Sequence, residues 1–210
     1  MEHFGLRLGV SKYGFKLIRE NFAVVNPCNT FYPEISHPSM KKYREKMREK
    51  FLRDYGIEMW TDETCKTYTE EWCQWCLRTS LEAYDQSMEY FSMLSKEEFK
   101  SSIDAFLRKN PQFVPVTDLN LYKGKSGYYL MVLDEYCQAY IGETNDIARR
   151  IREHWEKPAR FDRTLIRSGT ISIDRFRALD TTRIFVQKAF YRDREQAYIN
   201  QIPSKFMANV

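Results

Sequence analysis

The chain has 210 residues, of which 43% are apolar and 30% are charged, so it can form an ordinary hydrophobic core and is not disordered throughout. Its formal net charge is +4, and the basic excess lies in residues 121–210, which hold 16 Lys and Arg against 11 Asp and Glu. An arginine-rich surface favours partners that carry phosphate groups, although a solvated basic face has the same composition.

Secretion and membrane insertion are not indicated. No apolar run reaches the roughly 18 residues of a membrane span, and the N-terminus lacks the layout of a signal peptide. The five cysteines follow no disulfide framework. We therefore expect a cytoplasmic protein with free thiols and no membrane partner.

Two strands and a basic helix are predicted near the N-terminus. Apolar residues alternate with polar ones over 4–10, which predicts a strand, and residues 15–25 are a second candidate. Residues 39–56 carry apolar side chains every three or four positions, which predicts a helix. Its lysines and arginines could contact a nucleic-acid backbone, but a solvated helix face is the favoured interpretation.

Two further helices make the N-terminal part mainly helical. The first covers about 62–94, and the second starts with a capping box at Ser95 and runs to Lys109. Residues 111–115 hold two prolines and are predicted to be a linker. We therefore predict a mainly helical domain over residues 1–115, an accessory or target-recognition domain of unknown type.

Cys73 and Cys76 have the spacing of half a zinc site. A structural zinc site needs four ligands, and no second cysteine or histidine pair has a suitable spacing. Because the two cysteines have aromatic neighbours within a predicted helix, buried core thiols are favoured over a metal site.

The pattern after the linker is typical of an α+β domain. Three short runs predict strands, at 127–133, 138–142 and 182–190. The short connection between the first two implies an antiparallel hairpin, and helices are predicted at 147–155 and 193–202. We expect residues 120–210 to form a small three-stranded, mostly antiparallel sheet flanked by helices.

Charged residues beside the apolar stripes of these two helices are the candidate functional groups. Arg150 and His154 lie one turn apart at one edge of a stripe, where they would point toward the rim of the sheet. By themselves they would be interpreted as a snorkelling arginine and a core-edge histidine. Glu195 lies within the other stripe, where a carboxylate needs a partner. It is either in a structural ion pair, for example with Arg150, or a metal ligand, and the pattern alone does not distinguish these.

Residues 127–209 resemble the GIY-YIG nuclease domain. The family pattern has Gly-Ile-Tyr, about ten residues, Tyr-Ile-Gly, an arginine ten residues beyond the second tyrosine, a distant glutamate and a final asparagine. The matching residues are Gly127-Tyr128-Tyr129, Tyr140-Ile141-Gly142, Arg150, His154, Glu195 and Asn209. Tyr128 stands where the family has isoleucine, and we expect this position to serve in packing.

The resemblance implies hydrolysis of a phosphodiester bond in DNA with one divalent metal ion, Mg²⁺ or Mn²⁺. Mg²⁺ binds with few carboxylates and several waters, so Glu195 alone would be an adequate protein ligand. Arg150 would bind the attacked phosphate, since its planar guanidinium matches phosphate oxygens. Glu195 and Arg150 are expected to meet over one face of the sheet.

The resemblance also implies roles for the remaining motif residues. Tyr129 and Tyr140 would face the same site from neighbouring strands, and one of them, by preference Tyr129, would orient or deprotonate the attacking water. A phenolate base would need a lowered pKa, and otherwise the tyrosine only positions water. His154 would share in proton transfer or hold the phosphate, and Asn209 would fix the site from the C-terminal segment.

Substrate contacts are predicted around the same elements. Gly142 would allow a close approach of backbone or substrate. Arg149, Arg152 and Lys125 would bind phosphates without reading the base sequence. The expected partner is DNA, cut on one strand per active site, so a double-strand break would require a homodimer or a second binding event.

Two other functions fit the sequence. The C-terminal domain could be a catalytically inactive nucleic-acid-binding module that keeps the fold. Alternatively, residues 1–115 could be a protein-interaction domain that carries a nuclease effector. The endonuclease is favoured because every charged position of the motif is present.

Overall fold

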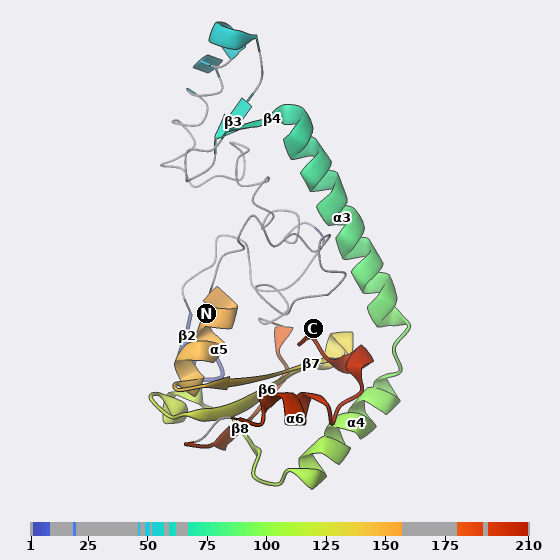
Figure 1. The fold of residues 1–210 in the computed structure, drawn as a ribbon, viewed down its shortest axis with the longest axis vertical. Helices are drawn as coiled ribbons and strands as arrows, with labels where there is room; N and C mark the ends of the chain where they lie inside the picture. Colours follow the sequence, from blue (N-terminus) through green and yellow to red (C-terminus); the bar gives the residue numbers. More distant parts are fainter. Residues whose placement is uncertain are drawn as a thin grey trace.

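The structure is a computed structural model, and it describes residues 2–8, 19, 46, 49, 50, 52–56, 59–61, 67–156, 180–190 and 193–209. The strand predicted at 15–25 and most of the helix predicted at 39–56 lie outside these residues. The described elements form an antiparallel sheet with helices on both sides, from which one long helix leads away (Figure 1). No helix in the described part of the chain is long and apolar enough to cross a membrane.

The main sheet has four antiparallel strands in the order β5-β8-β6-β7. They are β5 (Val114–Pro115), β6 (Gly127–Leu133), β7 (Gln138–Thr144) and β8 (Arg183–Lys188). Every residue of β6 is buried, which explains its continuous run of apolar and aromatic side chains. The α+β class and the antiparallel hairpin are therefore confirmed.

The expectation of three strands and of a linker over residues 111–115 is corrected by β5. Val114 pairs with Val186, and Pro115 pairs with Phe185, so this short segment is an edge strand. An edge position tolerates proline because one side of the strand needs no ladder donor. Two residues that include a proline give no strand signal in a sequence.

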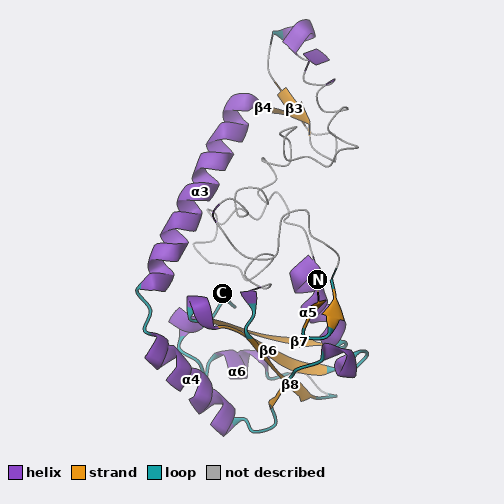
Figure 2. Ribbon diagram, turned by 180° about the vertical axis from the view of Figure 1, so that it is seen from behind, coloured by secondary structure: helices purple, strands orange, loops and turns teal. Residues whose placement is uncertain are grey.

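The two faces of the sheet are packed by different helices. Side chains of a strand alternate between faces, so Tyr129 and Met131 belong to one core and Tyr128, Leu130 and Val132 to the other. The first core is closed by α5 (Ile147–Glu156), and the second by α4 (Lys96–Lys109) and α6 (Glu195–Ile199). Figure 1 and Figure 2 show α5 on one side of the sheet and α4 with α6 on the other.

Helix α4 confirms the predicted capping box, since the Ser95 side chain accepts a hydrogen bond from the Glu98 N–H (3.2 Å). Its apolar face packs Phe99, Ile103 and Phe106 into the same core as strand β6. The hydrophobic core of the sheet therefore extends across the boundary predicted between residues 115 and 120.

Helix α3 (Glu70–Ser92) is the long helix that leads away from the sheet (Figure 2). The prediction placed its start near residue 62, but Thr67–Thr69 forms strand β4, which pairs antiparallel with β3 (Met59–Thr61). Residues 67–69 are β-branched or aromatic, which favours a strand before the helix begins. The two cysteines considered for zinc lie in α3, and their side chains are outside what the structure describes.

The N-terminal residues pack on the C-terminal core. The strand predicted over 4–10 is instead a tight hairpin of β1 (Glu2–His3) and β2 (Leu6–Arg7), because Phe4 and Gly5 adopt positive φ angles and reverse the chain. Leu6 and Leu8 are buried beside Ile151 and Trp155 of α5. The first residues of the chain are thus part of the core that supports α5.

Candidate active site

Three aromatic rings meet where α5 covers the sheet. The Tyr129 phenol oxygen lies 2.9 Å from His154 Nε2, within hydrogen-bond distance. The ring centroids of Tyr140 and His154 are 5.0 Å apart, and those of Tyr129 and Tyr140 are 6.1 Å apart. The two tyrosines face the same side of the sheet from neighbouring strands, as the sequence predicts.

Gly142 is required by this cluster. It pairs with Tyr129 across β6 and β7, and a Cβ at Gly142 would lie 2.2 Å from the Tyr129 phenol oxygen. Gly142 is itself buried, so the close approach that it allows is that of the Tyr129 ring. The structure thus gives Gly142 a packing role, and its contact with substrate stays a prediction.

The members of the cluster differ in their access to solvent. Tyr129 is 1% exposed and His154 is 4% exposed, whereas Tyr140 is only partly buried. Burial, together with the nearby Tyr140 and Glu195, raises the pKa of Tyr129 well above its ordinary value, and Arg150 offsets only part of this. A Tyr129 phenolate is thus disfavoured, while the role of either tyrosine in orienting water stays a prediction.

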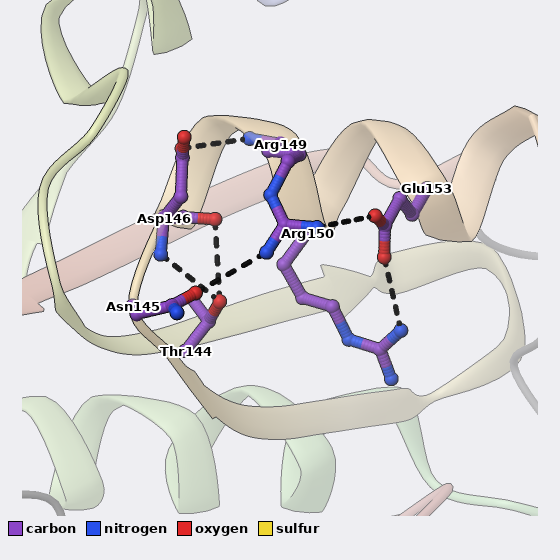
Figure 3. A network of polar contacts seen from close by, with 6 residues as sticks. All are labelled: Thr144, Asn145, Asp146, Arg149, Arg150 and Glu153. Atoms are coloured by element: carbon purple, nitrogen blue, oxygen red, sulfur yellow. Dashed lines mark hydrogen bonds and ion pairs between the residues drawn. The ribbon is translucent and has the colours of Figure 1, made fainter.

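Arg149 and Arg150 are adjacent in α5 but differ in what they contact (Figure 3). Arg149 donates to Glu153 Oε1 (2.8 Å) and to Asn145 Oδ1 (3.2 Å), so its fork is engaged on the helix surface. Arg150 extends toward the sheet, and its Nη1 lies 3.4 Å from Glu153 Oε2. Its side chain is 36% exposed, so part of it lies at the surface.

Glu195 approaches from the opposite face of the sheet. It is the first residue of α6, and its Oε2 accepts a hydrogen bond from the N–H of Glu143 (3.1 Å) on the outer edge of β7. Within the described residues Glu195 forms no ion pair, and the carboxylate that pairs with Arg150 is that of Glu153. The charge of Arg150 nevertheless lowers the pKa of Glu195, which opposes the effect of burial.

The expectation that Arg150 and Glu195 meet over one face of the sheet is therefore wrong. The two side chains come from helices on opposite faces, and Glu195 reaches the edge of β7. The physical reason is the direction of the chain after β8, which leads α6 to the face that α4 covers. Periodicity within α6 places Glu195 on the apolar side of its helix but does not report which face of the sheet that helix covers.

Asn209 acts on the same edge strand. Its Oδ1 accepts from the Ile141 N–H (2.8 Å), and its Nδ2 donates to the Ile141 carbonyl. Beside it, the Ala208 N–H donates to the Ala139 carbonyl (2.8 Å). Both functional atoms of the Asn209 amide are used on the backbone, so the residue fastens the C-terminal segment to β7 and does not point into the aromatic cluster.

The residues around Glu195 fit a hard divalent cation. Burial raises the pKa of Glu195, and the Glu143 carboxylate raises it further, while the Glu143 N–H and Arg150 act in the opposite direction. A cation bound beside two neighbouring carboxylates would relieve this cost, and oxygen ligands suit Mg²⁺ and Mn²⁺. Among the described residues no group of three or more His, Cys, Asp or Glu is arranged to hold a metal ion, a condition that a largely hydrated ion does not require.

The predicted phosphate contacts lie around the start of α5 and along it. The Lys125 carbonyl accepts from the Ile147 N–H (2.9 Å), which puts the exposed Lys125 at the beginning of this helix. Arg152 is exposed further along α5. The arginines between residues 157 and 179 all lie outside the described part of the chain.

Sequence reasoning missed two residues of this arrangement. Glu153 contacts both adjacent arginines, and its spacing of three and four residues from them was a usable signal. The backbone N–H of Glu143 donates a hydrogen bond to Glu195, and no sequence pattern predicts which backbone group will donate.

Comparisons with known proteins assign the chain to no family. The chain matches no protein-family model, and neither the curated proteins nor the solved structures gave a match.

Proposed function

We propose that this protein is a metal-dependent endonuclease that hydrolyses phosphodiester bonds in DNA, one strand per active site. The observation that carries the proposal is that a partly exposed guanidinium, Arg150, and a carboxylate, Glu195, both affect the pKa of Tyr129, which is paired with His154, while Glu195 is fixed at β7. The ordered GIY-YIG-like residues between 127 and 209 support the same chemistry.

Arg150 is the group that would contact the scissile phosphate. It is a permanent cation, and its fork can donate two hydrogen bonds to phosphate oxygens. Its contact with Glu153 at 3.4 Å is long for a hydrogen bond, so a phosphate can take its place at little cost. Charge that develops on the phosphate in the transition state would then meet a fixed cation.

The tyrosines and the histidine divide into a surface member and a buried pair. Tyr140 is the partly exposed ring, and we assign it the contact with the attacking water or the phosphate. Tyr129 and His154 lie beneath it and are joined by their 2.9 Å hydrogen bond. This pair packs against the Tyr140 ring, and its hydrogen bond gives the buried hydroxyl and imidazole a partner.

Glu195 would hold the divalent cation, with the Glu143 carboxylate close by. Such a cation would supply positive charge against the negative charge that develops during hydrolysis and would lower the pKa of bound water. The chain's own contribution is to keep the Glu195 carboxylate at the strand edge, where its Oε1 accepts no hydrogen bond from any described residue. That oxygen is the atom available to the ion.

The direct test is incubation of the purified full chain with supercoiled plasmid, branched DNA and single-stranded DNA, in Mg²⁺ and in EDTA. We expect cleavage in Mg²⁺ only, with nicked plasmid appearing before linear plasmid. Binding to DNA without cleavage in either condition would favour the inactive nucleic-acid-binding module. A protein that neither binds nor cuts would contradict the proposal.

A further inference from the structure

Tyr128 lies directly before Tyr129 in β6 and points to the opposite face of the sheet. Its side chain is 1% exposed, and its ring packs edge-on against that of Tyr198 in α6, with 5.1 Å between centroids. Its phenol oxygen accepts two backbone hydrogen bonds, from the N–H of Asp193 (2.8 Å) and from the N–H of Arg194 (3.0 Å). These two amides immediately precede Glu195.

The two hydrogen bonds replace a helix cap. The first N–H groups of a helix have no partner within the helix, and Arg194, at the N-cap of α6, supplies no side-chain cap. Because α6 has only five helical residues, its own hydrogen bonds do not fix where it begins. The start of α6 is thus held by a side chain from the sheet.

Two residues that pair across β6 and β7 hold Glu195, one through the backbone before it and one through its carboxylate. Tyr128 and Glu143 are direct partners in the register of β6 and β7. Tyr128 holds the backbone that leads into Glu195, and the Glu143 N–H holds the Glu195 carboxylate at 3.1 Å. The backbone that leads into Glu195 and the Glu195 carboxylate are therefore both held by this one pair of residues.

We propose that Tyr128 is a positioning residue whose hydroxyl fixes the start of α6 and so holds the Glu195 carboxylate at the edge of β7. An apolar side chain at this position would fill the core equally well but could not accept the two N–H groups. The consequence for cleavage rests on the proposed function, whereas the positioning itself does not.

The first test needs no substrate. Amide hydrogen exchange of the wild-type full chain, followed by NMR, should show protection at Asp193, Arg194 and Glu143, and rapid exchange at Asp193 and Arg194 would overturn the proposal without any variant. In Tyr128→Phe, which keeps the ring, we expect exchange at Glu143 to be about tenfold faster, as in Glu195→Ala.

Tyr198→Phe is the matched control. It removes a phenol hydroxyl from the same aromatic cluster, but that hydroxyl contacts Gln187 Oε1 at 2.9 Å and not the backbone before Glu195. We expect it to leave exchange at Glu143 unchanged. Equal acceleration in Tyr198→Phe and Tyr128→Phe would mean that general loosening of the core is responsible, and this would overturn the proposal, as would unchanged exchange in Tyr128→Phe.

Cleavage gives the second readout. In Tyr128→Phe we expect the turnover rate to fall about tenfold and the Mg²⁺ concentration for half-maximal rate to rise, while the DNA concentration for half-maximal binding stays the same. A wild-type rate and metal dependence in Tyr128→Phe would contradict the role in catalysis. If wild-type protein does not cut DNA, the proposed function fails, and the exchange at Glu143 still decides whether Tyr128 positions Glu195.

Discussion

The two faces of the β6–β7 hairpin divide the proposed active site between them. The face under α5 carries the tyrosine–histidine pair and Arg150, whereas the opposite face carries Tyr128 and the helix that begins with Glu195. Glu195 reaches the outer edge of β7, where its carboxylate accepts the Glu143 N–H. Because side chains alternate along a strand, the adjacent tyrosines lie on different faces of the sheet. Tyr129 lies on the face of Arg150, and Tyr128 lies on the face of the helix that begins with Glu195.

The largest expected effect is a difference in cleavage rate between variants of the two adjacent arginines of α5. Arg150→Ala should lower the cleavage rate by about 10²–10³-fold, since loss of one preorganised group that meets transition-state charge typically costs about 2.7–4 kcal/mol. Arg149→Ala should change the rate by less than about tenfold, because Arg149 is engaged with Glu153 and Asn145. Single-turnover cleavage of plasmid measures both, with Arg108→Ala on α4 as a surface control. Equal losses in the two adjacent variants would contradict the distinction.

Gly142→Ala tests the close packing on the same face. An added Cβ would overlap the Tyr129 phenol, so the ring must move, and we expect the free energy of unfolding to fall by about 1–3 kcal/mol. Denaturant unfolding followed by circular dichroism measures the loss. A variant as stable as the wild type would show that Tyr129 does not lie across Gly142.

The two tyrosines of this face should respond in opposite ways to loss of the hydroxyl. Tyr129→Phe leaves the buried His154 without its phenol partner, so the free energy of unfolding should fall by about 1–2 kcal/mol. Tyr140→Phe should leave stability nearly unchanged and lower the cleavage rate. Thermal unfolding and single-turnover cleavage of both variants make the comparison, and a rate loss confined to Tyr129→Phe would return the water-facing role to Tyr129.

The smallest expected effect concerns the connection between β6 and β7, away from both faces. Burial alone would raise the pKa of Asp134, but hydrogen bonds from Arg183 and Thr182 hold this pKa below its ordinary value. The stabilisation is therefore present above the ordinary aspartate pKa and is lost as the pH falls through the lowered pKa. Asp134→Asn should lower the free energy of unfolding by about 0.5–1 kcal/mol at pH 7, and the difference from wild type should disappear near pH 2. Urea unfolding at the two pH values tests this, and a difference that is the same at both would refute it.

Much of the C-terminal fold could be predicted from the sequence because its elements carry strong local signals. The apolar run of β6, the stripe of α5 and the capping box at Ser95 each report on a single segment. Strand β5 and the true start of α3 were missed, since a two-residue strand with a proline has no periodicity and a helix can be preceded directly by a short strand.

The arrangement of the candidate residues could not be predicted from the sequence. Spacing singled out Arg150 and Glu195, yet the face on which Glu195 arrives depends on how the chain crosses after β8. The need for Gly142 and the partners of the Tyr128 hydroxyl depend on the register of β6 with β7 and on contacts between distant residues. Patterns within one segment do not contain that information.

The most direct test of the central claim is the cleavage rate of Glu195→Ala in Mg²⁺, measured beside the wild type and beside Glu82→Ala, which removes an exposed carboxylate from α3. DNA binding in EDTA, measured on the same samples, checks that the variants still engage the substrate. We expect Glu195→Ala to bind DNA as the wild type does and to cut it at least about 100-fold more slowly. We expect Glu82→Ala to cut DNA at the wild-type rate. Cleavage by Glu195→Ala at the wild-type rate would contradict the proposed function.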